Sequence, residues 1–219
     1  MKKITAIIPV RMGSQRVKNK NVKPFAGSSL LEIKIKKLLS LGSLLKEIVV
    51  TSDCPEMLAT AEGLGVTTHR RDPYFAGSKA TNSEFFENLA NSIEGEHFMY
   101  SPVTCPLIST ETYRDCLNEY QKCGNVVTVK PVKHHLWLDG KPHNYDLTDS
   151  PNSQDLPDIY QITYGVCLLS KNDMRNCRNV VTNKPTFKIL NEIESTDIDT
   201  DFDFMLAETI YSKLEGDLV

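Results

Sequence analysis

A loop rich in cations follows the first apolar segment of the chain and has the composition of a phosphate-binding loop. The apolar run Ile4–Val10 is followed by four cationic residues among positions 11–20, together with Gly13 and Ser14. After a buried strand of an α/β protein, backbone N–H groups and fixed Arg and Lys charges bind phosphate. The loop has neither a Walker A ending nor a G-x-G-x-x-G fingerprint. It therefore predicts a phosphate site of another kind, and the alternative is a solvated cationic loop after an edge strand.

A second candidate site is a run of acidic residues just before the last expected helix. Aspartates occupy alternate positions from 197 to 203, and in an extended segment Asp197 and Asp199 point to the same side. Two adjacent carboxylates repel each other unless a divalent cation joins them, and Mg²⁺ accepts one or two carboxylates together with water and substrate phosphates. We therefore expect Asp197 and Asp199 to hold Mg²⁺ (or Mn²⁺). The alternative is that the acids only favour the positive end of the helix, which is the role expected of Asp201 and Asp203.

These candidate residues lie in a chain whose expected strands and helices alternate. Apolar runs predict strands over residues 4–10, 47–50, 66–69, 98–101, 125–130, 163–169 and 187–190. Periodicity and caps predict helices over residues 30–41, 55–63, 82–93, 111–122, 173–177 and 200–214, with Asp53 capping the second of them. This alternation implies a three-layer α/β fold with a mostly parallel twisted sheet. Ligands of such sheets bind beyond the carboxyl ends of the strands, where the cationic loop also lies.

The alternation breaks between residues 131 and 162. Prolines and polar residues interrupt every apolar run in this segment, which predicts an irregular insertion or a small strand-and-loop excursion. The 219 residues are enough for one α/β domain with such an appendage. We therefore interpret residues 1–219 as a single domain.

Charge and cysteine content narrow the class of protein. A net charge of -3 argues against a nucleic-acid partner, because nucleic-acid-binding proteins usually carry a basic surplus. The cations concentrate near the start of the chain, which suits a local anionic ligand. None of the six cysteines forms a C-x-x-C pair, so free thiols and a cytoplasmic location are expected. No apolar run reaches membrane-spanning length, so no membrane partner is expected.

Four motifs resemble, in order, those of the acylneuraminate (CMP-sialic acid) cytidylyltransferase family. The segment Pro9–Asn21 is similar to the family's Pro-Ala-Arg-Gly-Gly-Ser-Lys-Arg loop, with Met12 in place of its first glycine. The motifs Thr51-Ser52-Asp53 and Arg71–Ala76 resemble the family's Ser-Thr-Asp and Arg-Pro-x-x-Leu-Ala. Asp-Ile-Asp-Thr, followed by Asp-Phe and Leu-Ala-Glu, resembles its C-terminal metal motif.

The resemblance implies a nucleotide-diphosphosugar transferase-like fold and a CTP-dependent nucleotidyltransferase that makes a CMP-sugar for polysaccharide biosynthesis. A hydroxyl group of a sialic-type (nonulosonic) acid would attack the α-phosphate of CTP, and pyrophosphate would leave. Catalysis of this kind is mainly positioning and neutralisation of phosphoryl charge. The implied partners are CTP and an acidic small-molecule acceptor. The family also forms homodimers through its excursion, which here holds Trp137 and Leu138; the alternative is that both residues pack within their own subunit.

The resemblance also implies roles for individual residues. Arg11 and the amides near Gly13 and Ser14 would hold phosphate, and Lys20 would stabilise the departing pyrophosphate or the α-phosphate. Arg71 would approach the nucleotide; the alternative is a surface arginine paired with an adjacent aspartate. The implied nucleotide-binding residues are Arg11, Gly13, Ser14, Lys20, Asn21, Arg71, Ala80, Thr81 and Asn82. The implied catalytic set is Arg11, Lys20 and Asp199, with Asp197 and Asp199 as metal ligands.

The departures from the family cluster on the acceptor side. Members acting on sialic acid carry Leu-Gln-Pro-Thr-Ser-Pro-Leu-Arg after the central strand, and here Pro102 and Ile108 replace its Gln and Arg. Ser153 replaces the first Arg of Arg-Gln-x-Leu-Pro, which removes a charged contact worth about 1.5–3 kcal/mol. The acceptor candidates that remain are Thr104, Lys133, Gln154 and Tyr164, with His134 and His135 as further anion contacts or simply as packing residues.

Three alternatives to a sialic-type acceptor stay open. The first is a cytidylyltransferase for a different acid, such as a phosphonate or another keto-sugar acid, which the changed acceptor positions favour. The second is a GT-A glycosyltransferase, although its Asp-x-Asp motif follows a central strand rather than standing near the C-terminus. The third is an inactive nucleotide-binding relative, against which the retained Arg11, Lys20, Asp197 and Asp199 argue.

Overall fold

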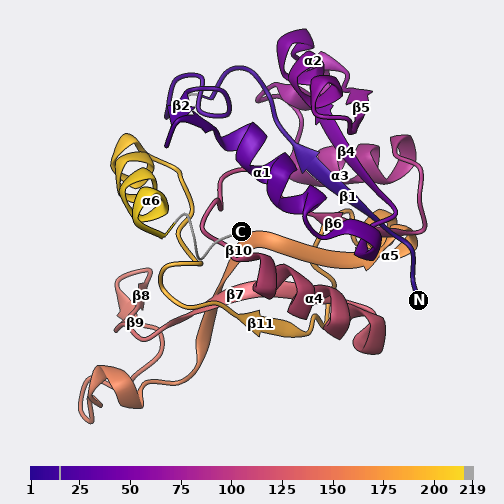
Figure 1. The fold of residues 1–219 in the computed structure, drawn as a ribbon. Helices are drawn as coiled ribbons and strands as arrows, with labels where there is room; N and C mark the ends of the chain where they lie inside the picture. Colours follow the sequence, from indigo (N-terminus) through magenta and orange to yellow (C-terminus); the bar gives the residue numbers. More distant parts are fainter. Residues whose placement is uncertain (15, 215–219) are drawn as a thin grey trace.

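Seven strands form the central sheet in the order β11-β7-β10-β6-β1-β4-β5 (Figure 1). The structure is a computed structural model and describes residues 1–14 and 16–214. Its sheet strands are β1 (Ile4–Pro9), β4 (Glu47–Ser52), β5 (Thr67–Arg70), β6 (His97–Tyr100), β7 (Val126–Val132), β10 (Ile159–Ser170) and β11 (Phe187–Ile189). All neighbouring pairs are parallel except those of β10, which runs antiparallel to β6 and β7. The expected mostly parallel sheet is confirmed.

Helices cover both faces of this sheet and complete three layers. They are α1 (Leu30–Leu39), α2 (Pro55–Gly63), α3 (Asn82–Ser92), α4 (Thr110–Cys123), α5 (Lys171–Cys177) and α6 (Asp201–Leu214), with short 3₁₀ turns at 42–44, 73–76 and 153–155. Ile4, Ala6 and Ile8 of β1 enter the core under α1, α2, α4 and α6. Ile7 faces the other way and packs with α3 and α5. Because successive side chains of a strand point to opposite faces, a strand between two helix layers is apolar throughout.

A long two-stranded ribbon carries the irregular segment away from the sheet. β7 and β10 continue past their neighbours, and residues 129–132 pair with residues 159–162. The expected excursion of 131–162 was therefore too wide, because both of its ends are strand. The part between them, 133–158, forms an arm with a two-stranded hairpin of β8 (Trp137–Leu138) and β9 (Lys141–Pro142), which projects from the body in Figure 1.

Some helix caps agree with what the sequence predicts, and one does not. Thr81 and Glu84 form a full capping box at the start of α3, and Gly124 ends α4 with a φ of 83°. The expectation that Asp53 caps α2 is wrong. The N-cap residue is Cys54, and the Cys54 N–H donates to the Ser52 hydroxyl 3.0 Å away.

No helix in residues 1–14 and 16–214 is long and apolar enough to span a lipid bilayer. All six cysteines lie in the described part and are free thiols, as expected.

A small hairpin of β2 (Pro24–Phe25) and β3 (Ser28–Ser29) leads into α1, and the Ala26 N–H in its turn donates to Glu208 of α6 at 2.9 Å. This contact joins the residues that follow the cationic loop to the last helix.

Candidate active site

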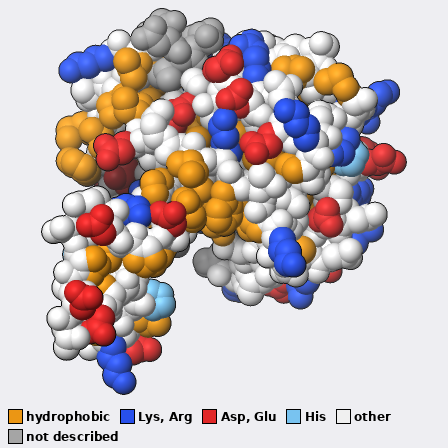
Figure 2. Space-filling model, turned by 90° about the horizontal axis from the view of Figure 1, so that it is seen from below, with side chains coloured by type: hydrophobic (Ala, Val, Ile, Leu, Met, Phe, Trp, Pro, Cys, Tyr) orange, Lys and Arg blue, Asp and Glu red, His pale blue; other side chains and the backbone are white. Residues whose placement is uncertain are grey.

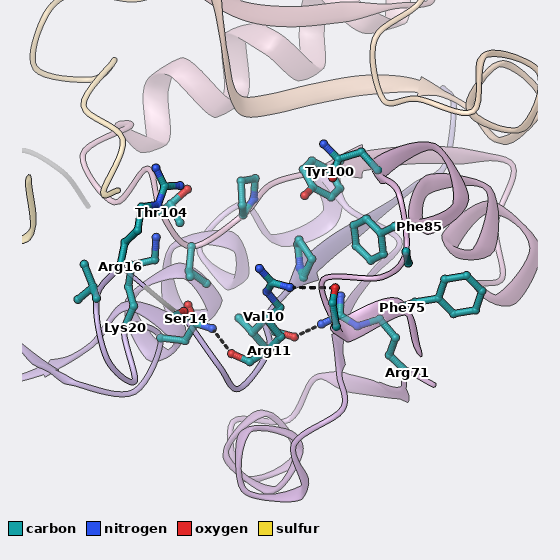
Figure 3. A pocket seen from close by; sticks show the side chains of 18 residues that line it. Val10, Arg11, Ser14, Arg16, Lys20, Arg71, Phe75, Phe85, Tyr100 and Thr104 are labelled. Atoms are coloured by element: carbon teal, nitrogen blue, oxygen red, sulfur yellow. Dashed lines mark hydrogen bonds between the residues drawn. The ribbon is translucent and has the colours of Figure 1, made fainter. Parts of the chain in front are cut away.

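A cavity of about 520 Å³ lies beyond the carboxyl ends of β1 and β6, where α/β sheets bind ligands. Figure 3 shows Arg16, Lys20 and Thr104 on one side of it and Arg71, Phe75 and Phe85 on the other, with Val10 and Arg11 between them. Its lining residues are Pro9, Val10, Arg11, Ser14, Arg16, Val17, Lys20, Asn21, Arg71, Phe75, Gly77, Ala80, Asn82, Phe85, Tyr100, Pro102, Val103 and Thr104. The volume is in the range of small-molecule sites.

The cationic loop closes one side of this cavity through contacts with the acidic segment. The Arg16 guanidinium pairs with the Asp199 carboxylate at 2.6 Å, and the Lys20 ammonium donates to the carbonyl of Ile198. Burial lowers the pKa of Lys20, while the charges of Asp197 and Asp199 raise it. Two segments almost 180 residues apart in the sequence therefore meet as a cationic and an anionic surface.

Asn21 and Arg11 shape the cavity wall through hydrogen bonds to backbone. The buried Asn21 amide donates to the carbonyl of Arg11 at 2.9 Å. The Arg11 guanidinium donates to the carbonyls of Ala76 and Gly77 at 2.8 and 3.3 Å. Arg11 therefore holds the start of the segment that leads to Ala80 and ties the cationic loop to the opposite wall.

Arg71 is a buried cation with spare hydrogen-bonding capacity at the aromatic side of the cavity. Only 3% of it is exposed, its guanidinium donates to the Val10 carbonyl, and it lies 5.1 Å from the centre of the Phe85 ring. Among the described residues its Nε has no hydrogen-bond partner. Burial lowers the pKa of Arg71 to about 10, so the group stays charged at neutral pH. The alternative of a surface arginine paired with Asp72 is wrong, because Arg71 is buried and the ion pairs of the described residues do not include this one. The Asp72 carboxylate instead accepts from the N–H of Tyr74 at 2.8 Å.

Asp197 and Asp199 flank the buried Ile198 at the Lys20 side of the site. Asp197 is accessible to solvent, yet the protein around it displaces enough water to raise the pKa of its carboxyl, and the charge of Asp199 raises it further. Asp203 accepts from the N–H and hydroxyl of Thr200, both at 2.8 Å, which confirms its capping role. Two neighbouring carboxylates whose negative charges repel each other are suited to bind a divalent cation. No group of three or more metal-ligating side chains occurs in the described residues, so a Mg²⁺ ion would take its other ligands from water and phosphates.

The structure brings together most, but not all, of the residues predicted from the sequence. Those lining the cavity are Arg11, Ser14, Lys20, Asn21, Arg71, Ala80, Asn82 and Thr104. Gly13, Thr81, Tyr164, Asp197 and Asp199 lie outside the lining. The Thr81 hydroxyl is used in the capping box of α3. Lys133 pairs with Asp158 at 2.7 Å at the base of the arm, and Gln154 is exposed on the arm.

Sequence reasoning missed several lining residues. Arg16, which pairs with Asp199, stood inside the predicted phosphate loop, so its charge was the available signal. Phe75 and Phe85 had no comparable signal, because an aromatic residue beside a helix start is as easily part of the core. Tyr100 ends β6 and is 9% exposed, so only the tertiary structure shows that it faces the cavity.

Two buried lysines of α1 lie beneath the loop that carries Thr104. Lys34 is 1% and Lys37 6% exposed, and burial lowers the pKa of Lys34 to about 8 and that of Lys37 to about 7. In the unfolded chain both side chains stay protonated to above pH 10. Because the unfolded state then binds more protons between pH 7 and 9, the free energy of unfolding is expected to rise with pH.

The size of this rise depends on competing groups. Each fully deprotonated lysine adds about 1.4 kcal/mol per pH unit, whereas the buried thiols of Cys105, Cys116 and Cys167, whose pKa values are raised, oppose the gain above about pH 8.5. We expect a net gain of about 1–2 kcal/mol between pH 7 and 9, measured by urea unfolding. The Lys34→Met/Lys37→Met double variant should lose the gain. An equal gain in that variant would contradict the assignment.

Comparisons with known proteins agree with this geometry. A family profile described as Cytidylyltransferase matches residues 5–155. The chain is 26% identical over 225 residues to an N-acylneuraminate cytidylyltransferase of Escherichia coli O18:K1:H7, which covers 96% of this chain and 52% of that protein. It is also 26% identical over 238 residues to a CMP-N,N'-diacetyllegionaminic acid synthase of Legionella pneumophila, at 99% and 100% coverage. The chain thus spans about half the length of the Escherichia coli relative.

Solved structures share the fold. A CMP:2-keto-3-deoxy-manno-octonic acid synthetase complexed with CTP aligns with a TM-score of 0.70 at 11% identity, covering 96% of this chain and 99% of that one. A 4-diphosphocytidyl-2C-methyl-D-erythritol synthase of Anaerococcus prevotii aligns with a TM-score of 0.70 at 17% identity, covering 95% and 96%. The profile match extends over more than half of the 219 residues. Two of the motifs that carried the resemblance, Pro9–Asn21 and Arg71–Ala76, contribute residues to the cavity wall, and the C-terminal motif contacts Arg16 and Lys20. This chain therefore belongs to the cytidylyltransferase family.

Proposed function

We propose that this chain transfers CMP from CTP to a hydroxyl group of an acidic sugar of the nonulosonic class and releases pyrophosphate. The observation that carries the proposal is a continuous cavity that has Arg11, Lys20 and Arg71 in its wall, with the Asp197–Asp199 pair beside Lys20. The names of the relatives, which act on acylneuraminic and legionaminic acids, support the acceptor class. Membership of the cytidylyltransferase family argues against the GT-A alternative.

The lining residues divide into a base side and a phosphate side. The unpartnered Nε of Arg71 and the rings of Phe75 and Phe85 suit a nucleobase, which offers both a flat face and polar edge atoms. Arg16 and Lys20 are the cations nearest the acidic segment and suit the triphosphate. The acceptor oxygen bonds to the α-phosphorus as the bond to the bridging oxygen of the β-phosphate breaks, with its electron pair leaving on pyrophosphate. The hydroxyl proton is released.

Asp197 and Asp199 are the residues that would hold Mg²⁺ or Mn²⁺ in this site. Bound there, the cation would supply Lewis-acid stabilisation of the phosphoryl oxygens. Lys20 donates to the carbonyl between the two aspartates, which keeps its ammonium next to the same phosphate group. Arg16 pairs with Asp199, and its guanidinium would be available to the triphosphate if that carboxylate held the metal.

Thr104 is the acceptor candidate that lines the cavity, beside the acidic segment. Its carbonyl accepts from the N–H of Ile198 at 2.9 Å. Tyr164 stands in the left-handed region with a φ of 56°, at the irregular point of β10. Strain of this kind at a non-glycine residue clusters at ligand-binding sites, so we keep Tyr164 with Thr104 in the proposed acceptor side. Lys133 and Gln154 lie on the arm and stay predictions.

The test is pyrophosphate release from CTP and Mg²⁺ across sialic, legionaminic, pseudaminic and 2-keto-3-deoxy-octonic acids and simple phosphonates. We expect turnover with a nonulosonic acid and a CMP-sugar product identified by mass spectrometry. Reactions without Mg²⁺, in excess chelator, are the control. Turnover only with a phosphonate or an eight-carbon acid would favour the alternative acceptors. CTP binding without any turnover would favour an inactive relative, and absence of CTP binding would overturn the proposal.

We also propose that two copies of this chain associate through the arm. Trp137, Leu138 and Leu147 expose 55%, 59% and 61% of their surface there. Hydrophobic side chains also gather on the body of the molecule in Figure 2, where they are visible between charged groups. Apolar side chains clustered on a projecting hairpin are typical of an interface.

Replacing Trp137 and Leu138 by serine is expected to convert a dimer into a monomer. Light scattering after size-exclusion chromatography measures the mass directly. Leu39→Ser, at an exposed leucine of α1, is the control and should stay dimeric. A wild-type mass of one chain, about 24.6 kDa, at micromolar concentration would contradict the proposal.

A further inference from the structure

Lys34 is a fully buried ammonium that binds the loop between β6 and α4 from beneath. Its Nζ donates to the Ser101 hydroxyl at 3.0 Å, to the Cys105 carbonyl at 3.4 Å and to the Tyr113 hydroxyl. The Ser101 hydroxyl in turn donates to the carbonyl of Gly165 on β10 at 2.9 Å. All three described partners of Lys34 are neutral, so the charge is hydrogen-bonded but not compensated. An ammonium buried in this way is costly and is retained where it has a task.

Lys37 repeats the arrangement one helical turn further along α1. Its Nζ donates to the carbonyls of Pro106 and Ile108 at 2.8 and 2.7 Å. Residues three apart on a helix lie on the same side, so the two ammonium groups bind successive carbonyls of one loop. Together they hold Ser101 and the carbonyls of residues 105, 106 and 108.

The upper side of the same loop contacts the proposed reaction centre. Pro102, Val103 and Thr104 line the cavity, and the Thr104 carbonyl accepts from the N–H of Ile198. The Cys105 thiol lies 3.8 Å from a carboxylate oxygen of Asp197. A shift of the loop would therefore move Thr104 and Asp197 together.

We propose that Lys34 and Lys37 form a buried lysine support that positions the 101–108 loop, and with it Thr104 and Asp197, for an anionic acceptor. The acceptor part rests on the proposed function. Apolar side chains at positions 34 and 37 would leave the carbonyls of residues 105, 106 and 108 without these donors, so the lysines hold the loop through hydrogen bonds. In their protonated form they also attract an anion above the loop. A support of this kind matters most on the acceptor side, because the described hydrogen bonds of the two ammonium groups do not reach the cationic loop or Arg71.

Kinetics test the positioning role. Lys34→Met and Lys37→Met keep the length of the side chain and remove its charge and its donors. We expect kcat/KM for the acceptor to fall about tenfold or more, because small misplacements near a reacting centre are costly. The dissociation constant of CTP should change by less than about threefold. Lys36→Met, at the exposed lysine between them, is the matched control and should behave as the wild type.

Thiol labelling tests the same loop without any turnover. Cys105 is 1% exposed, and its alkylation rate, followed by peptide mass spectrometry, reports opening of the loop. We expect labelling about tenfold faster in Lys34→Met and Lys37→Met, with the buried Cys167 of β10 still protected. Unchanged labelling would overturn the proposal, and so would equal acceleration at Cys167, which would indicate general unfolding.

The two tests keep this proposal separate from the proposed function. Faster labelling of Cys105 with unchanged acceptor turnover would overturn the link to the acceptor. If the wild type turns over no acceptor at all, the proposed function fails, whereas the labelling rates still decide whether the lysines position the loop.

Discussion

Replacing Lys20 with methionine is expected to lower kcat/KM for CTP about 10²–10³-fold while the protein stays folded. The ammonium group is half-buried and is hydrogen-bonded to the carbonyl between Asp197 and Asp199. Burial lowers its pKa and the two carboxylates oppose that shift. Methionine keeps the length and the apolar contacts of the lysine side chain. It removes the positive charge that offsets the negative charge on the phosphoryl oxygens in the transition state.

Pyrophosphate release gives kcat/KM for this variant, and calorimetry gives its affinity for CTP. The larger loss should be in kcat, because charge at the α-phosphate grows during the reaction. Lys18→Met is the matched control, since Lys18 is an exposed lysine of the same loop outside the cavity lining. Equal losses in both variants would mean that only the net charge of the loop matters. If Lys20→Met turned over at a rate close to that of the wild type, Lys20 would have no role in the reaction.

Much of the fold could be predicted from the sequence because central strands such as β1, β4 and β6 are buried on both faces. Continuous apolar runs such as Ile4–Val10 have few other interpretations in a chain of alternating elements. The direction of β10 was not accessible, because an apolar run is the same whether its neighbours are parallel or antiparallel. The width of the excursion was overestimated for a related reason: Pro131 was interpreted as a strand breaker, whereas it lies inside β7 opposite Tyr160.

The sequence predicted those parts of the candidate site in which charged residues are concentrated in a short segment. Arg11, Lys20 and the two aspartates stood out by type and spacing, and the structure places them around one cavity or beside it. Lys34 was overlooked although its position gave a signal, since it lies four residues from Leu30 and from Leu38 on the apolar side of α1. A lysine is ordinarily assigned to the solvated face of a helix, so the residue type concealed what the spacing indicated.

The largest loss of activity is expected from Asp197→Asn, about 10³-fold or more, because several kcal/mol of metal-assisted charge stabilisation would be removed. Asparagine keeps the shape of the side chain and one of its two oxygen atoms but not its charge. The protein around Asp197 already disfavours the charged form and raises its pKa. Without metal or nucleotide, the melting temperature of the variant should therefore equal or exceed that of the wild type. A loss of activity with a lowered melting temperature would indicate a structural role instead.

A metal-binding measurement distinguishes the proposed metal ligands Asp197 and Asp199 from Asp201 in the same acidic segment. Addition of Mg²⁺ and CTP is expected to raise the melting temperature of the wild type and of Asp201→Asn, but not that of Asp197→Asn or Asp199→Asn. Asp201 is the matched control because its exposed carboxylate pairs with Lys23 at 3.7 Å, away from the cavity. Asp199→Asn also breaks the ion pair with Arg16, so its affinity for CTP without metal should rise as Arg16 becomes available. If Mg²⁺ and CTP raised the melting temperature of Asp197→Asn as much as that of Asp201→Asn, the metal would not bind to the Asp197–Asp199 pair. The two carboxylates would then serve only to hold Lys20 and Arg16.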